Sequence, residues 1–92
     1  MSSLSDRVSL RAPNLAVKAY VLIQVTPGKT DEILRQLLKI QGVKQASPVT
    51  GRYDIIAYIE AESIADLGRI VTRSIRAIPG VLSTETAVVI SS

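Results

Sequence analysis

Hydrophobic and polar side chains alternate along residues 17–25, "VKAYVLIQV". A period of two is expected of a β-strand, because successive side chains point to opposite faces of the sheet. The segment "TPGK" then interrupts the alternation with a proline and a glycine. The pattern therefore predicts a strand over 17–25 followed by a turn.

The next segment has helical spacing, and its apolar residues are Ile33, Leu34, Leu37 and Leu38. Thr30 is expected to cap the start of this helix, and Gly42 supplies the left-handed conformation that commonly ends one. A short strand, "VKQASPVT" at 43–50, is predicted to follow. Its Pro48 cannot donate to a ladder, which favours an edge strand or a bulge.

The second half repeats this order. "YDIIAYIE" at 53–60 is predicted to be a strand, and Ser63 and Asp66 are spaced as a variant of the capping box. Gly80 ends the second predicted helix, and "VLSTETAVVI" at 81–90 is the last strand. The apolar positions of that helix are Ile64, Leu67, Val71, Ile75 and Ile78.

The two halves align with a constant offset: Tyr20 matches Tyr58 and Gly42 matches Gly80, 38 residues apart in each case (58−20, 80−42). Two β-α-β units with right-handed crossovers interleave most simply into a four-stranded antiparallel sheet with both helices on one face. The prediction is an α+β, ferredoxin-like β-α-β-β-α-β sandwich over 17–92, preceded by a flexible N-terminal tail at 1–16.

Such a sandwich leaves one face of the sheet without helices. If Val21, Ile23, Ile55 and Ile59 face the helices, the alternate residues face away from them. An apolar patch of this kind usually marks an association surface. We therefore expect a homodimer in which two sheets pack face to face across a two-fold axis, through Tyr20, Leu22, Ile56 and Tyr58.

Composition narrows the function classes. The 92 residues include no Cys and no His, so thiol nucleophiles, imidazole bases and the usual zinc ligands are excluded, and no catalytic residue, metal or cofactor is predicted. No apolar run approaches the roughly 20 residues that span a bilayer, and a cytoplasmic protein without membrane association is expected. The net charge of +3 is small and dispersed, which argues against a nucleic-acid track.

The predicted turn within "VTGRYDIIAYI" at 49–59 contains more charged and polar residues than a turn requires. Gly51 stands where a hairpin must reverse. Asp54, however, follows an aromatic residue at the start of a hydrophobic strand, where an acid is disfavoured unless a partner compensates it. The partner is either Arg52 or the ammonium group of a ligand.

The segments "AYVLIQVTPGK", "IQGV", "IPGV", "TGRYD" and "VLSTETAVVI" together give residues 17–90 a specific resemblance. The chain resembles the effector-binding, or RAM, domain of the Lrp/AsnC family of amino-acid-responsive transcription regulators. The resemblance implies sheet-to-sheet dimers that assemble into octamer-like rings, with an amino-acid effector bound between dimers. The residues it implies for that site are Gly51, Tyr53, Asp54, Ser83, Thr84 and Thr86, with Asp54 accepting the ligand's ammonium group.

Full-length members of that family carry an N-terminal winged helix-turn-helix, whereas 16 residues precede the domain here. This length is expected of the stand-alone form, which lacks the DNA reader, so no direct DNA binding is expected. A full-length Lrp/AsnC regulator is a candidate partner in mixed assemblies.

Two alternatives remain at this stage. An ACT-like regulatory domain has the same strand order and would bind an amino acid at the "TPGK" loop around Gly28. A small enzyme of the dimeric α+β barrel type would need an acid or base in a pocket between sheet and helices. Its candidate residues are Asp54, Glu60, Glu62, Asp66 and Glu85.

Overall fold

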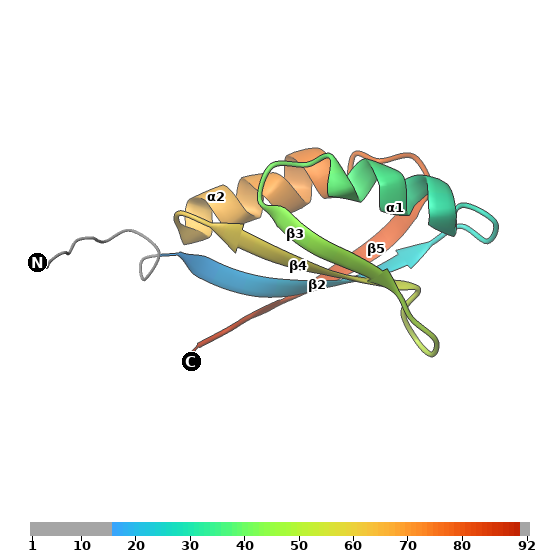
Figure 1. Ribbon diagram of the computed structural model, residues 1–92, viewed down its shortest axis with the longest axis horizontal. Coiled ribbons are helices and arrows are strands. Elements are labelled where there is room, and N and C mark those ends of the chain that lie inside the picture. Colours follow the sequence, from blue (N-terminus) through green and yellow to red (C-terminus); the bar gives the residue numbers. More distant parts are fainter. Residues whose placement is uncertain (1–15, 91–92) are drawn as a thin grey trace, which may run out of the picture.

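A computed structural model describes residues 16–90, and the element order is β-α-β-β-α-β, as predicted (Figure 1). Residues 1–15 of the expected N-terminal tail lie outside the described residues. The elements are β2 (Val17–Val25), α1 (Thr30–Leu38), β3 (Val43–Pro48), β4 (Ile55–Ala61), α2 (Ile64–Arg69), the π-helical segment η2 (Ile70–Ile75) and β5 (Val81–Val88).

The strands form one sheet in the order β3-β4-β2-β5, and the three strand pairs are all antiparallel. The helices cover one face of this sheet and leave the other bare (Figure 1). The fold is therefore the predicted ferredoxin-like sandwich. The edge position inferred from Pro48 is also confirmed, because β3 pairs with β4 alone.

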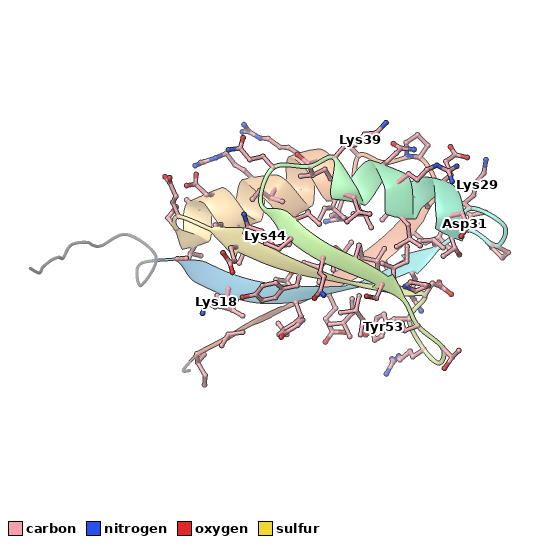
Figure 2. The ribbon with its side chains drawn as sticks, in the orientation of Figure 1. Lys18, Lys29, Asp31, Lys39, Lys44 and Tyr53 are labelled. Atoms are coloured by element: carbon pink, nitrogen blue, oxygen red, sulfur yellow. The ribbon has the colours of Figure 1, made fainter. Side chains whose placement is uncertain are left out.

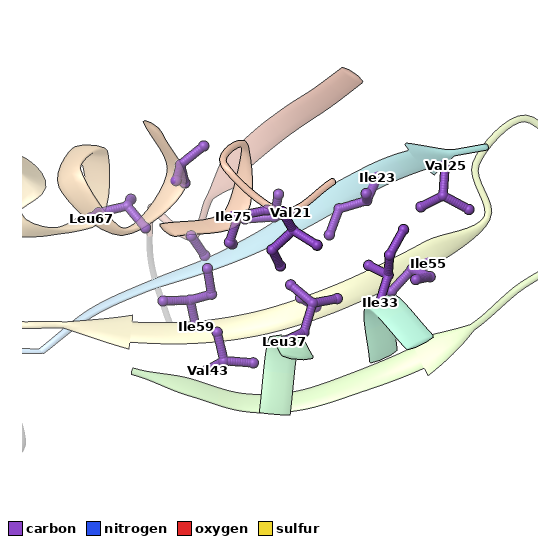
Figure 3. Packing of buried hydrophobic residues seen from close by; sticks show 14 of the residues in the cluster. Val21, Ile23, Val25, Ile33, Leu37, Val43, Ile55, Ile59, Leu67 and Ile75 are labelled. Carbon is purple, nitrogen blue, oxygen red and sulfur yellow. The ribbon is translucent and has the colours of Figure 1, made fainter. Parts of the chain in front are cut away.

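The core lies between the sheet and the helices and is aliphatic (Figure 3). None of the described residues buries a polar or charged side chain. Each fully buried aliphatic side chain contributes about 1.5–3 kcal/mol relative to an exposed one. The largest of these side chains are Val21, Ile23, Ile33, Leu37, Ile55, Ile59 and Ile75.

The ends of the helices support the internal repeat. Gly42 and Gly80 have φ angles of 100° and 98°, so both helix exits use the left-handed conformation that favours glycine. At α2 the predicted cap is present, since the backbone N–H of Asp66 donates to Ser63 Oγ at 3.0 Å. The predicted Thr30 cap is wrong: Thr30 is already helical, Lys29 occupies the capping position, and no side-chain cap bond forms there.

The second helix departs from the expected regular α-helix. It changes at Ile70 into a π-helical segment, and the backbone N–H of Arg76 donates to the Val71 carbonyl at 2.9 Å, five residues back. Ile64, predicted to lie on the apolar face, is 62% exposed, and Leu38 of the first helix is also exposed.

Candidate functional site

The loop at residues 49–54 joins β3 to β4 at one end of the sheet. Gly51 has a φ of 111°, and a side chain there would meet no atom within 4 Å, so the backbone conformation alone explains the glycine. The Val49 N–H donates to the Asp54 carbonyl at 2.9 Å, which closes the loop. The Asp54 N–H donates to the Ile23 carbonyl, also at 2.9 Å, and so joins the loop to β2.

Asp54 has a structural partner. Its Oδ2 accepts a hydrogen bond of 2.8 Å from the backbone N–H of Val25 in β2. The β2–β4 pairing runs up to Ile23 opposite Ile55, so the carboxylate continues the ladder one step past the start of β4. A backbone group therefore compensates the acid, whereas the part of the chain that the structure describes shows no ion pair between Arg52 and Asp54.

A chain of side-chain hydrogen bonds ties the loop to β5. Ser83 Oγ donates to Gln24 Oε1 at 2.6 Å, and Gln24 Nε2 donates to the Arg52 carbonyl at 2.9 Å. Gln24 lies directly opposite Ser83 in the β2–β5 ladder, which explains how the two side chains meet. Three segments far apart in the sequence are thereby fixed to one another at this end of the sheet.

Tyr53 reaches across the same end of the sheet, and its hydroxyl donates to Glu85 Oε1. Figure 2 shows Tyr53 on the side of the sheet away from the helices. The hydrogen bond to Glu85, together with partial desolvation and the negative charge of that carboxylate, raises the pKa of the Tyr53 phenol above its ordinary value. We call this group the corner: Gln24, Arg52, Tyr53, Asp54, Ser83 and Glu85.

The structure divides the site residues suggested by the sequence. Tyr53, Asp54 and Ser83 come together at the corner, and Gly51 lies in the loop at residues 49–54 next to it. Thr84 and Thr86, by contrast, lie opposite the core residues Ile23 and Val21. Directly paired residues share one face of a sheet, so both threonines are on the helix side, away from Ser83. Those two hydroxyls are therefore not part of the corner.

Sequence reasoning missed Gln24 and Glu85 as members of the corner. A signal for Gln24 was present: it is a polar residue at a position that the strand alternation assigns to the face without helices. Glu85 lies on the same face, opposite Leu22. Their pairing with the loop depends on strand register, which the sequence alone did not give.

The face without helices, which we call the bare face, has an apolar centre. Tyr20, 47% exposed, lies opposite Tyr58, and the two rings are 5.2 Å apart at 46°. Leu22 and Ile56 form the next pair along the same strands. By register, the outer strands contribute Gln45, Ser47 and Glu85 to this face. An apolar centre with polar edges is the usual anatomy of a protein interface.

A hollow of about 860 Å³ lies at the opposite end of the sheet. Glu60, Glu62 and Asp66 line it, whereas Asp54 and Glu85 belong to the corner. The carboxylates considered for an enzyme are thus divided between two ends of the sheet. Among residues 16–90, none of them lies in the aliphatic interior between sheet and helices.

Within the described residues, no helix is long and apolar enough to cross a membrane. Over the same residues, no group of three or more Asp and Glu side chains is placed to hold a metal ion.

Comparison with known families decides the relationship. The model of the Lrp/AsnC ligand binding domain matches residues 18–92, which cover every element of the fold except the first residue of β2. The chain belongs to the Lrp/AsnC ligand-binding domain family. Among solved structures, the Lrp/AsnC chain resembles hypothetical protein PHS023 from Pyrococcus horikoshii with a TM-score of 0.76 and 34% identity, covering 83% of this chain and 92% of that one.

Curated relatives of this Lrp/AsnC domain are longer proteins. The HTH-type transcriptional regulator LysM from Sulfurisphaera tokodaii is 33% identical over 75 residues, which are 80% of this chain and 53% of that protein. The chain thus spans about half the length of the regulators it matches. A homocitrate synthase from Sulfolobus acidocaldarius is 36% identical over 89 residues, but these are 19% of the enzyme, so the match assigns no catalysis to this chain.

Proposed function

We propose that this chain is an amino-acid-binding regulatory module that associates with itself through the bare face and binds its effector at the corner, at a subunit interface. Family membership supports a ligand-binding role. The single observation that carries the proposal is the position of the corner at the margin of the bare face, where Tyr53 and Glu85 join the loop to a strand of that face. A second subunit packed on the bare face would border the corner.

The proposed dimer follows from the chemistry of the bare face. Tyr20, Leu22, Ile56 and Tyr58 occupy its centre as two directly opposed pairs, so their apolar surface is contiguous. Burying apolar surface contributes about 25 cal/mol per Å², and a two-fold axis would bury the same patch on both copies. Such dimers would then assemble into a larger, octamer-like ring, the assembly expected from the family resemblance.

The effector would be held by complementary charges at the corner. Asp54 uses Oδ2 for the Val25 N–H, which leaves Oδ1 to accept from the ligand's α-ammonium group. The backbone next to Gly51 is exposed, and its N–H groups are suited to the α-carboxylate. The hydrogen bonds through Gln24 hold the loop in place before binding, which lowers the ordering cost of binding.

Regulation requires that the effector bind the different oligomeric states with unequal affinity. An effector shifts an assembly equilibrium only if it binds one oligomeric state more tightly than another, which is expected when a neighbouring subunit completes the site. We place the protein in the cytoplasm with an amino acid as its small-molecule partner. A full-length Lrp/AsnC regulator is a further proposed partner, through mixed assemblies that use the same bare face.

Isothermal calorimetry against the twenty standard amino acids tests the proposal. At least one should bind the wild-type chain, and Asp54→Asn should abolish that binding while retaining an acceptor for the Val25 N–H. Gly28→Val serves as the matched control, since it alters a glycine loop outside the corner. Loss of binding in the Gly28 variant alone would favour an ACT-like site, and a null result across the panel would exclude the effector role.

A further inference from the structure

The corner carries one more carboxylate than a neutral amino acid requires. Arg52 contributes one positive charge, and Asp54 and Glu85 contribute one negative charge each, so the sum is −1 (1 − 2), whereas the whole chain carries +3. A zwitterionic ligand with an uncharged side chain would leave this negative charge in place. A ligand with a second cation would neutralise it.

Glu85 is placed to receive that second cation. Its Oε1 accepts from the Tyr53 hydroxyl, and no ion pair within the described residues neutralises it. It lies opposite Leu22, at the margin of the apolar centre of the bare face. If a second subunit covers that centre, Glu85 loses water and requires a cationic partner to remain charged there.

Tyr53 links the two acidic residues. Its backbone is adjacent to that of Asp54, while its hydroxyl contacts Glu85, so about one tyrosine side chain separates Glu85 Oε1 from the backbone beside Asp54. The side chain of lysine is of similar length from its Cα to its terminal ammonium. An effector whose α-ammonium group is held at Asp54 would therefore place its side-chain cation at Glu85, with its methylene groups along the ring.

We propose that Glu85 is a specificity-determining residue and that the effector class is amino acids with a cationic side chain, such as L-lysine or L-arginine. The inference rests on the proposed function, because it assigns the side-chain end of the same site. Glu85 selects by charge and by position, and Asp54 recognises the part common to all amino acids.

L-Norleucine is the matched ligand for the test, because it has the aliphatic chain of lysine without the terminal ammonium group. Calorimetry on the wild-type chain should give a Kd for lysine at least about tenfold lower than for norleucine, as one charge-assisted hydrogen bond predicts. Glu85→Gln should bring the two Kd values to within about twofold. Glutamine keeps an acceptor for the Tyr53 hydroxyl, so the substitution removes the charge without removing that hydrogen bond.

Glu62→Gln is the control variant, since Glu62 is also exposed but lines the hollow at the other end of the sheet. It should keep the wild-type preference for lysine. If norleucine binds as tightly as lysine to the wild-type chain, or if Glu85→Gln keeps the preference, the selectivity inference is wrong while the amino-acid site stands. If neither ligand nor any other amino acid binds, the proposed function itself is wrong.

Discussion

Removing the carboxylate of Asp54 should destabilise the fold before any ligand is considered. In Asp54→Ala the N–H of Val25 loses its 2.8 Å acceptor, at the point where the β2–β4 ladder ends. A hydrogen bond to a charged group contributes about 1.5–3 kcal/mol. Asp54 is half-buried, so water replaces part of the lost bond. We therefore expect the free energy of unfolding to fall by about 1–2 kcal/mol.

Asp54→Asn separates this structural role from the binding role. The side-chain oxygen of asparagine still accepts from the Val25 N–H, but without the negative charge, so the expected loss is about 0.5 kcal/mol. Urea denaturation followed by circular dichroism measures both variants. The protein concentration must be the same in every experiment, because association would contribute to apparent stability.

Two outcomes would refute this reasoning. If alanine and asparagine cost the same, the Val25 hydrogen bond does not stabilise the fold. If both are neutral, the loop is held by its other contacts, such as the Gln24 side chain on the Arg52 carbonyl. The difference in stability between the alanine and asparagine variants also bears on function. If the asparagine variant is nearly as stable as the wild type, its loss of ligand binding reflects the missing charge and not an altered loop.

Two further predictions concern stability. Gly42→Ala would place a methyl group 3.1 Å from the Glu60 carbonyl oxygen at a φ of 100°, whereas Gly51→Ala would place one in open space at a φ of 111°. Urea denaturation should therefore show that Gly51→Ala lowers the free energy of unfolding by about 1–2 kcal/mol and that Gly42→Ala lowers it clearly more. The hydrogen bond to Glu85 raises the pKa of Tyr53 in the folded chain. The stability that this bond contributes is therefore present below pH 10 and is lost as the pH rises through the folded pKa. In urea titrations at alkaline pH, Tyr53→Phe should lose less stability with rising pH than the wild type.

Much of the fold could be predicted because its patterns are local. Alternation along 17–25 identified both faces of β2, and the 38-residue offset identified matching helix exits at Gly42 and Gly80. The course of the second helix could not be predicted. Its apolar spacing fits an α-helix, but residues 70–75 form a π-helical segment, and Ile64 at the start of the helix is exposed.

The corner was only partly predictable because it depends on register. "TGRYD" indicated a functional loop, but the partner of Asp54 is a backbone N–H of β2, which becomes available only where the β4 ladder ends. The β2–β5 pairing shifts between Gln24 and Val25. A shift of one residue changes which side chains share a face, and register therefore decides that Ser83 belongs to the corner and Thr84 does not.

The most direct test of the central claim is the mass of the assembly in solution. Light scattering should give the wild-type chain about twice its 9.9 kDa or a higher multiple, and Leu22→Arg, in the centre of the bare face, should reduce this to 9.9 kDa. Ile64→Arg, at an exposed aliphatic residue of α2, should assemble like the wild type. A wild-type monomer at micromolar concentration, or an unchanged assembly in Leu22→Arg, would contradict association through the bare face.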